Sequence, residues 1–571
     1  MARDSIHSMM SALPTLPALL EHIGHPQPRK GLSFLDFAIV LIAGCAHALS
    51  VAWPFSSGLA QGQPVWWLQL LAMAALVRSL ERCVRFKQGL LLGWLFATAW
   101  LCGIFWWLFI SLHRYGGLAA PLTVLAVVGL AIFLATYYAV ACAAYVRLAP
   151  LGQTRRAIVF AALWLLAELA RVEFFTGFPW GAAGYAHLDG WMDGYARWIG
   201  VHGITFLAAF LAASVAGLGR SRRQLVMFPV LAALMVAGAL AGGKQTSTSA
   251  GSLQVTLLQG NIAQDEKFQP GTGLPTALRW YGEQLQGART ALVVAPETSL
   301  PLLPQQLPEG YWRAVQARFA SGQQAALIGI PLGSYSAGYT NSAVGLKPFS
   351  AGPPQGKSAP SGGSEVREAT SVGASTFGQA QPFRFDKHHL VPFGEFVPPG
   401  FRWFINLMNI PLGDFRRGPL GQPSFDWQGQ RLAPNICYED LFGEELGASF
   451  TDAATAPTVL VNLSNIGWFG NTIAIDQHLA ISRMRALEFE RPMLRATNTG
   501  ATVIIDHRGK VTHELPRHTR GALVGEVEGR NGITPYAWWV SRYGLWPLWA
   551  LGLGVAGLAL GFRLRSGRLL A

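Results

Sequence analysis

Eight apolar stretches, most of them close to the length of a membrane span, constrain this chain more than any other feature. A helix needs about 20 predominantly apolar residues to cross a bilayer. Seven stretches lie within the first 245 residues and one near the C-terminus, at 34–52, 63–80, 88–112, 118–146, 156–174, 195–218, 224–243 and 543–562. Only 13% of the residues are charged, against about 25% in an average soluble domain. The sequence therefore predicts a multi-span α-helical membrane bundle of about eight spans.

The basic residues between these stretches orient the predicted bundle. The net charge of +13 would also suit a nucleic-acid-binding protein, but the basic residues lie between apolar runs, as in a membrane protein. With eight spans, five basic clusters fall on one side: Arg29 and Lys30; Arg78, Arg82, Arg85 and Lys87; Arg147, Arg155 and Arg156; Arg220, Arg222 and Arg223; Arg563, Arg565 and Arg568. The positive-inside rule assigns that side to the cytoplasm. We therefore expect both termini in the cytoplasm and the long segment before the last span outside.

The outward segment is typical of a soluble α/β domain. Short β-rich runs, such as 253–261 and 291–297, alternate with helix-like stretches, such as 311–320 and 474–490. Apolar strands that alternate with helices favour a buried sheet. Residues 349–382 are rich in Gly, Ser, Ala and Pro, which predicts a disordered insertion. We expect four parts: a cytoplasmic extension (1–30), the transmembrane bundle (31–244), the outward domain (245–535), and a final span with a basic cytoplasmic tail (536–571).

Cysteine usage singles out one residue of the outward domain. Four of the five cysteines lie in or next to predicted spans, and Cys437 is the only one outside them. An unpaired cysteine on the oxidising side of a membrane is a candidate reactive thiol. The alternative is that Cys437 is a small buried hydrophobe, as most free cysteines are.

Three patches of the outward domain place ionisable residues at the ends of predicted strands. Glu297 follows a strand in VVAPETS, Lys387 and Glu395 lie in RFDKHHLVPFGEFVPPG, and Cys437 lies in NICYED. Folds of the α/β class place their sites at strand ends. A thiol attacks as the thiolate, so it needs a base or a nearby cation, and the resulting oxyanion needs donors. Taken singly these residues are ordinary, but together they would supply a base, a cation and a nucleophile.

These motifs, in this order, resemble the Glu-Lys-Cys triad of the carbon-nitrogen hydrolase (nitrilase) superfamily. Within it, the chain is most similar to the apolipoprotein N-acyltransferase family, an integral membrane branch. The likeness covers about residues 30 to 565 and includes TGFPWGAAGY, QGNIAQDEKF, YTNSA, SNIGWFG, QHLAISRMRALEFERPMLRATNTG and ITPYAWW. It implies a nitrilase-like αββα sandwich for the outward domain. Two departures are visible: Phe268 stands where the family often has tryptophan, and Ile466 where it has aspartate.

The resemblance also implies a role for each motif residue. Cys437 would be the nucleophile, Glu297 the general base and Lys387 the cation that stabilises the oxyanion, together with the backbone N–H of Tyr438. The supporting residues would be Glu395, Tyr438 and Glu439. Candidates for substrate binding or for a lid that dips into the membrane interface are Phe268, Trp403, Phe404 and Trp468.

The reaction implied by the resemblance is a two-step, ping-pong acyl transfer. Cys437 would take an acyl chain from a membrane phospholipid, with phosphatidylethanolamine as the expected donor. The thioester would then acylate the α-amino group of the N-terminal diacylglyceryl-cysteine of an apolipoprotein. We expect a monomer in the bacterial inner membrane, with its catalytic domain in the periplasm and without a cofactor or nucleic acid. No metal is expected, because His388 and His389 are adjacent and complete no set of zinc ligands.

Two other functions remain open on the sequence. A membrane-tethered amidase or nitrilase would use the same triad with water as the acceptor, although a small polar substrate would not require eight spans. A non-catalytic membrane-anchored binding protein would keep Cys437 as part of its core.

Overall fold

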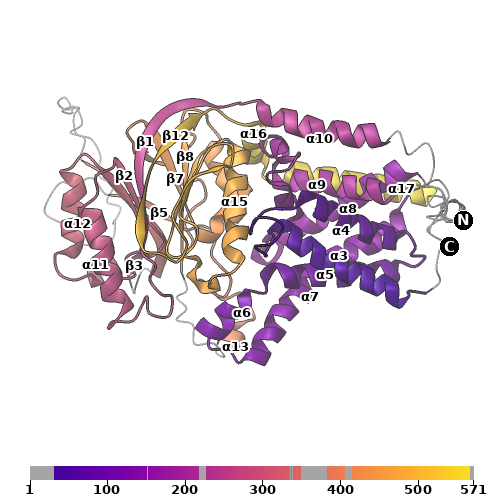
Figure 1. The fold of residues 1–571 in the computed structure, drawn as a ribbon, viewed down its shortest axis with the longest axis horizontal. Coiled ribbons are helices and arrows are strands. Elements are labelled where there is room, and N and C mark those ends of the chain that lie inside the picture. Colours follow the sequence, from indigo (N-terminus) through magenta and orange to yellow (C-terminus); the bar gives the residue numbers. More distant parts are fainter. Residues whose placement is uncertain are drawn as a thin grey trace, which may run out of the picture.

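The computed structural model describes residues 31–150, 152–217, 227–334, 336, 338–348, 382–405 and 415–565. A helical bundle and a two-sheet sandwich lie side by side along the long axis of the molecule (Figure 1). The predicted extension at 1–30 and nearly all of the predicted insertion, 349–381, lie outside the described residues. The basic residues Arg220, Arg222, Arg223 and Arg568 lie outside them as well.

Each of the eight predicted apolar stretches contains a helix of the bundle. These are α3 (Phe34–Val51), α4 (Trp66–Leu80), α5 (Phe86–Phe105), α7 (Ala120–Leu148), α8 (Gln153–Glu173), α9 (Ala196–Ala216), α10 (Met227–Gly243) and α17 (Trp546–Arg565). Within the described part of the chain, five helices are long and apolar enough to cross a membrane: α3, α5, α7, α9 with the turn before it, and α17. Helices α4 and α10 are shorter, and α8 carries charged residues at both ends. The structure thus supports a membrane protein with at least these candidate spans, while eight spans stay a prediction.

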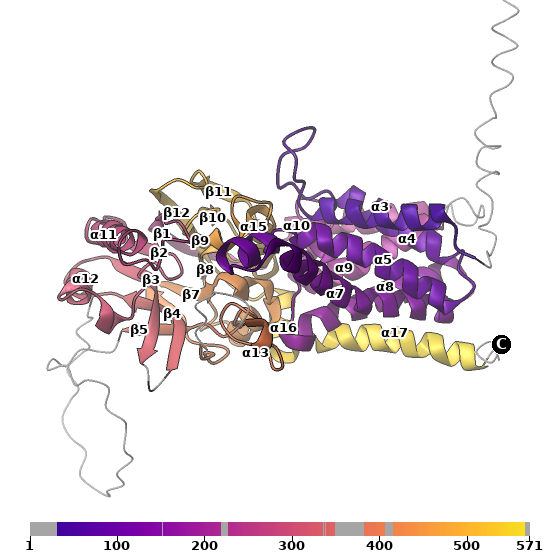
Figure 2. The same ribbon diagram turned by 90° about the horizontal axis from the view of Figure 1, so that it is seen from below.

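The basic ends of several helices meet at the end of the bundle that lies away from the sandwich (Figures 1 and 2). Arg82, just after α4, pairs with Asp36 at the start of α3 at 3.6 Å. Arg156 at the start of α8 pairs with Glu81 at 3.9 Å. Arg563 in the last turn of α17 donates to a backbone carbonyl at the end of α7. The described clusters therefore share one end, and its assignment to the cytoplasm remains a prediction.

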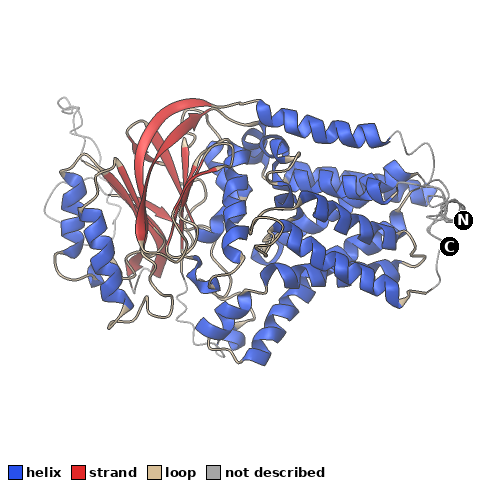
Figure 3. Ribbon diagram, in the orientation of Figure 1, coloured by secondary structure: helices blue, strands red, loops and turns tan. Residues whose placement is uncertain are grey.

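The sandwich consists of two six-stranded sheets (Figure 3). The first has the order β12-β1-β2-β3-β4-β5 and contains β1 (Thr248–Gln259), β2 (Leu292–Ala295), β3 (Ala325–Ser334), β4 (Gly338–Leu346), β5 (Phe383–Asp386) and β12 (Gly521–Asn531). The second has the order β11-β10-β9-β8-β7-β6 and contains β6 (Phe425–Trp427), β7 (Gln430–Ile436), β8 (Val459–Ser464), β9 (Met493–Thr497), β10 (Val503–Ile505) and β11 (Val511–Glu514). In each sheet three central strands run parallel, and the outer strands pair antiparallel.

Helices cover the outer face of each sheet, so the layers follow the order αββα. Helices α11 (Gly273–Gln286) and α12 (Tyr311–Ala320) cover the first sheet, and α15 (Ala474–Phe489) lies between the second sheet and the bundle (Figure 1). In β1, Val255 and Leu257 pack between the sheets, whereas Leu258 packs under α11 and α12, as the alternation of side chains along a strand requires. The predicted fold class, a membrane bundle with a nitrilase-like α/β sandwich, is confirmed. Short helices complete the chain: α6 (Leu108–Ile110), α13 (Arg402–Ile405), α14 (Gly443–Gly447) and α16 (Pro535–Tyr543).

One hydrophobic core continues from the bundle through α15 to the second sheet. At its centre lies Gln477 of α15, which is buried. Its Oε1 accepts hydrogen bonds from the indole Nε1 of Trp107 at 3.0 Å and of Trp180 at 2.8 Å. Its Nε2 donates to the carbonyl of Ile104 in α5 at 3.1 Å. The bundle and the sandwich are therefore joined by packing and by directional hydrogen bonds.

Replacing Gln477 by methionine should destabilise the protein, because it leaves two buried indole N–H groups without an acceptor. Each unsatisfied buried donor costs about 1–3 kcal/mol, so the free energy of unfolding should fall by roughly 2–6 kcal/mol. Thermal unfolding in detergent measures the loss. The matched control, Gln286→Met at the exposed end of α11, should change stability by no more than about 0.5 kcal/mol. Equal unfolding midpoints for the two variants would contradict the assigned role of Gln477.

Candidate active site

Three strand ends bring the predicted triad together at one edge of the sandwich. Glu297 lies two residues after β2 and Lys387 directly follows β5, both in the first sheet. Cys437 directly follows β7 in the second sheet. Lys387 Nζ lies 3.3 Å from Glu297 Oε1, and the charges of both residues act on the thiol of Cys437. The site is thus assembled across the two sheets.

Lys387 lies in a buried cluster of polar groups. Its Nζ donates to Glu395 Oε1 at 2.9 Å as well as to Glu297. Asn341 Nδ2 donates to the same oxygen of each carboxylate, at 2.7 Å in both cases. Burial would lower the pKa of Lys387, but the carboxylates of Glu395 and Glu297 outweigh it and raise the pKa above its ordinary value. Lys387 therefore carries a firmly held positive charge.

Cys437 is held in an uncommon backbone conformation at the start of a 3₁₀ turn (Cys437–Leu441). Its φ is +52°, and such strain in a non-glycine residue persists only where the surroundings enforce it. Its carbonyl oxygen lies 3.2 Å from both Asn462 Nδ2 and His478 Nε2. His478 Nδ1 faces a guanidinium nitrogen of Arg495 at 2.9 Å, so Nε2 carries the proton and donates to Asp440 at 2.8 Å. A buried network thus holds the turn that presents the thiol.

The thiol of Cys437 is protonated at neutral pH. Burial raises its pKa to about 12, the charge of Glu297 adds to the rise, and Lys387 opposes it. A thiol in this state becomes a nucleophile only when a base removes its proton. The carboxylate of Glu297 is the candidate base, and its second oxygen, Oε2, accepts the backbone N–H of Asn465 at 2.9 Å.

The raised pKa predicts how Cys437 reacts with iodoacetamide. Because the thiolate is the reactive form, the alkylation rate should climb steadily from pH 7 to pH 10 without a plateau. The label is quantified by mass spectrometry of the peptide that contains Cys437, with Cys437→Ala as the blank. A half-maximal rate near pH 8.5 and a plateau from about pH 9.5, the behaviour of an ordinary thiol, would contradict the assignment.

Glu439 ties the lysine loop to the cysteine turn. Its Oε1 accepts the backbone N–H groups of His388 at 2.6 Å and of His389 at 3.3 Å, just after Lys387. Its Oε2 accepts the N–H of Ile436 at 2.6 Å, just before Cys437. Burial raises the pKa of Glu439 to about 8, and these N–H donors and Lys387 limit the rise. Glu439 therefore links the loop that carries Lys387 to the turn that carries Cys437.

Tyr438 and His389 fasten the site to the loop that follows α8. The hydroxyl of Tyr438 donates to the carbonyl of Gly177 at 3.0 Å. One ring nitrogen of His389 lies 2.9 Å from the carbonyl of Thr176, and the other lies 2.8 Å from Glu445 Oε1. The loop after α8 thus contacts Tyr438, the residue next to Cys437, directly.

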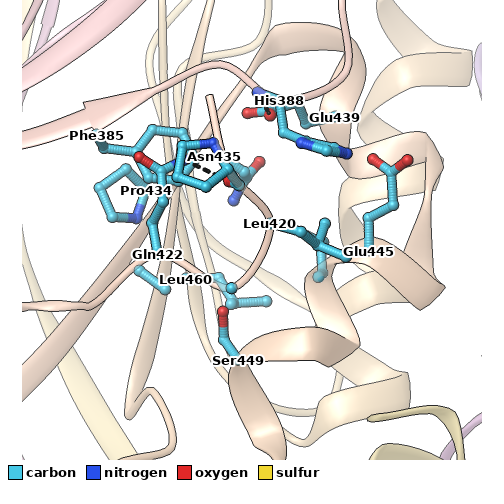
Figure 4. Close-up of a pocket in the computed structure, with 14 residues that line it drawn as sticks. Phe385, His388, Leu420, Gln422, Pro434, Asn435, Glu439, Glu445, Ser449 and Leu460 are labelled. Carbon is cyan, nitrogen blue, oxygen red and sulfur yellow. Dashed lines mark hydrogen bonds between the residues drawn. The ribbon is translucent and has the colours of Figure 1, made fainter. Parts of the chain in front are cut away.

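A small pocket lies beside the triad rather than over the thiol (Figure 4). Its lining includes His388, Asn435, Glu439 and Glu445, and none of the three triad residues. His388 Nδ1 is turned to the carbonyl of Gly418 at 2.8 Å. The two adjacent histidines therefore have separate partners.

The structure separates the candidates for substrate contact. Phe268 and Trp403 are 49% and 61% exposed, as side chains that meet a substrate or a membrane interface must be. Trp468 instead packs edge-on against Tyr115, with ring centroids 5.6 Å apart. Phe404 belongs to α13, but its side chain lies outside the described residues. The roles of these four residues stay predictions.

Sequence reasoning did not single out several residues that hold the triad in place. Lys267 Nζ donates to the carbonyl of Glu297 at 3.2 Å and to Thr298 Oγ1 at 2.6 Å. The others are Asn341, Asp440, His478 and Arg495. Each of these residues lies within a motif that carried the family resemblance. The motifs could therefore have marked them as candidates, but could not show which groups they contact.

Comparisons with known proteins agree with this architecture. The family model "Apolipoprotein N-acyltransferase N-terminal domain" matches residues 43–214, and "Carbon-nitrogen hydrolase" matches residues 254–532. An apolipoprotein N-acyltransferase from Verminephrobacter eiseniae is 56% identical over 528 residues, which cover 88% of this chain and 92% of that protein. The chain belongs to the apolipoprotein N-acyltransferase family.

Further members of the apolipoprotein N-acyltransferase family are similar over nearly their full length. The protein from Ralstonia nicotianae is 41% identical, with 88% of this chain and 90% of that protein covered. The solved carbon-nitrogen hydrolase from Helicobacter pylori G27 covers 52% of this chain and 94% of its own, with 14% identity and a TM-score of 0.31, too distant to add to the assignment. Ile466, noted in the sequence as a departure from the expected family motif, is fully buried in the apolar core.

Proposed function

We propose that this chain completes bacterial lipoproteins by acylating their N-terminal α-amino group. The acyl chain would come from a membrane phospholipid, with phosphatidylethanolamine as the expected donor, and would pass through a thioester on Cys437 to a diacylglyceryl-cysteine acceptor. The proposal is carried by one observation in particular, the hydrogen-bonded Lys387 and Glu297 pair beside a thiol on a strained turn. Family membership supports the choice of substrates.

In the first step, Glu297 takes the proton of the Cys437 thiol, and the thiolate attacks the ester carbonyl of the phospholipid. The resulting oxyanion is stabilised by Lys387 Nζ and by the backbone N–H of Tyr438. When this intermediate collapses, the carbon–oxygen ester bond breaks. The lysophospholipid leaves with the proton held by Glu297, and the acyl chain stays on Cys437 as a thioester.

In the second step, the amino group of the acceptor attacks the thioester carbonyl. Glu297 takes a proton from the attacking amine, and Lys387 again faces the oxyanion. Collapse breaks the carbon–sulfur bond, an amide forms, and Cys437 regains its proton from Glu297. The enzyme returns to its starting state without a cofactor. Because the first product leaves before the acceptor reacts with the thioester, the substrates follow a ping-pong order.

The two ends of the bundle support a proposed placement in the cell. The described basic clusters lie at the end away from the sandwich, which the positive-inside rule assigns to the cytoplasm. The sandwich would then lie in the periplasm, with both termini in the cytoplasm of a multi-pass inner-membrane protein. We expect this protein to act as a monomer. The boundaries between its parts are proposed to lie near residues 31, 245 and 536.

The test uses the full chain in detergent with phosphatidylethanolamine that carries a labelled acyl chain. We expect a hydroxylamine-sensitive label on the Cys437 peptide, and its transfer to an added diacylglyceryl-cysteine peptide with a free α-amino group. An N-acetylated copy of that peptide should accept nothing. Phosphatidylglycerol with the same acyl chain tests the preference for the headgroup. Absence of a labelled thioester, or release of the label only as free fatty acid, would contradict acyl transfer.

A further inference from the structure

Lys267 is a second buried lysine at the site, and its hydrogen-bond partners are uncharged. It lies in the loop that follows β1 and is 2% exposed. Its Nζ donates to the backbone carbonyl of Glu297 and to the hydroxyl of Thr298. Burying an ammonium group is costly unless it is well paired. A lysine kept in such a place therefore calls for an explanation beyond packing.

Lys267 holds both sides of a strained turn. Thr298 has a φ of +45°, which is a genuine outlier for a β-branched residue, and such strain persists only where the surrounding structure enforces it. The turn immediately follows Glu297 and so determines where its carboxylate points. Lys267 Nζ donates to the backbone carbonyl of Glu297 and to the side chain of Thr298. A single ammonium group therefore holds both residues of the turn.

The same loop is also fastened to the second sheet. Ile262 N–H donates to Asn498 Oδ1 at 3.0 Å, and Asn465 Nδ2 donates to Gln264 Oε1 at 2.8 Å. Asn465 in turn donates its backbone N–H to Glu297. The loop therefore bridges the sheet that carries the base and the sheet that carries the nucleophile.

We propose that Lys267 is a positioning residue that holds Glu297 in register with Cys437, and thereby sets how readily the thiol loses its proton. This inference rests on the proposed roles of Glu297 as base and Cys437 as nucleophile. Electrostatics agree with the geometry: burial lowers the pKa of Lys267 to about 8, while the charges of Glu297 and Cys437 both act to raise it. Phe268, the next residue, has its ring centroid 6.0 Å from Lys267 Nζ, so the lysine also adjoins a candidate substrate contact.

The test measures the rate at which iodoacetamide alkylates Cys437, which requires neither lipid nor acceptor. At pH 8.5 little thiolate forms without a base, so the rate depends on proton transfer from the thiol to Glu297. Lys267→Met should slow alkylation at pH 8.5 by about 100-fold, the lower end of the 10²- to 10⁴-fold range that a positioned general base contributes. Lys267→Arg, which keeps the charge and the donors, should restore most of the rate. Lys347→Met, at an exposed lysine that also donates to a backbone carbonyl, is the matched control and should react at the wild-type rate.

A double-variant cycle tests whether Lys267 acts through the turn. Thr298→Val removes one of its partners and should slow alkylation severalfold. The double variant should be no slower than Lys267→Met alone, because coupled residues are not additive. In acyl transfer, Lys267→Met should lower kcat and leave KM for the phospholipid nearly unchanged.

Three outcomes would overturn the inference: wild-type alkylation in a folded Lys267→Met chain, additive effects in the cycle, or a change in KM alone. If Lys267→Met does not fold, Thr298→Val decides, and a wild-type alkylation rate in that variant overturns the inference. A chain that is alkylated as expected but transfers no acyl group would instead contradict the proposed function.

Discussion

Replacing Cys437 by alanine is expected to abolish acyl transfer and to leave the fold intact. Without the sulfur no thioester can form, and loss of a covalent nucleophile typically lowers kcat by about 10⁴-fold or more. The strained turn should survive, because alanine meets the same φ restriction as cysteine. Its anchors, Asn462 and His478, bind the backbone carbonyl of residue 437 rather than its side chain.

The measurement is acylation of the diacylglyceryl-cysteine peptide, followed by mass spectrometry. Cys45→Ala, at an exposed cysteine of α3, is the matched control and should retain full activity. The free energy of unfolding of Cys437→Ala should lie within about 0.5 kcal/mol of wild type. Acylation above about 1% of the wild-type rate would show that the reaction does not proceed through Cys437.

Replacing Lys387 by methionine should damage both activity and stability. Removing one partner of a buried ion pair costs about 3–5 kcal/mol, since Glu297 and Glu395 would stay buried with only Asn341 as a shared donor. Loss of an oxyanion donor lowers kcat by about 10²–10³-fold. Because the pKa of Lys387 is raised in the fold, its stabilising contribution is fully present below the ordinary lysine pKa. That contribution is lost only as the pH rises through the raised value, so it should hold from pH 6 to pH 9.

A second substitution separates the two effects. Lys387→Met combined with Glu395→Gln removes one of the unpaired carboxylates, so it should recover part of the lost stability. It should recover no activity, because the cation is still absent. Thermal unfolding and acyl transfer are measured on the same preparations. Recovery of both together would mean that Lys387 is needed only for folding.

The sequence predicted those features that depend on local pattern. Long apolar runs produced the helices, and continuous apolar strands such as 457–465 predicted β8. Short or polar strands escaped notice: β5 contains Arg384 and Asp386, and its place is fixed by pairing with β4. Hydropathy predicted the apolar stretch that contains α8, but not how the carboxylate of Glu168 within it is paired. In the fold that carboxylate is fully buried and is bonded to His202 and Thr205 of α9.

In the candidate site, too, local sequence pattern predicted some residues, whereas others became evident only from their contacts in the fold. Glu297, Lys387 and Cys437 stand at strand ends in distinctive motifs, so the sequence pointed to them. Lys267 and His478 act through contacts with residues about 30 and 40 positions away, and a polar side chain in one sequence gives no sign of whether it will be buried. Such partners became visible only when the two sheets were placed against each other.

The apolar core that runs from the bundle through α15 joins the two halves of this protein, so we expect the sandwich alone to fold poorly. A fragment that began at residue 245 would present the inner face of α15 to water, with Gln477 deprived of both tryptophans. Such a surface promotes aggregation. His478, the neighbour of Gln477, contacts the backbone carbonyl of Cys437. A lipid or detergent that loosens the packing of Gln477 should therefore also disturb the turn that holds Cys437. If Cys437 is the nucleophile, as proposed, the packing of the membrane helices would therefore bear on its position as well as on access to a lipid substrate.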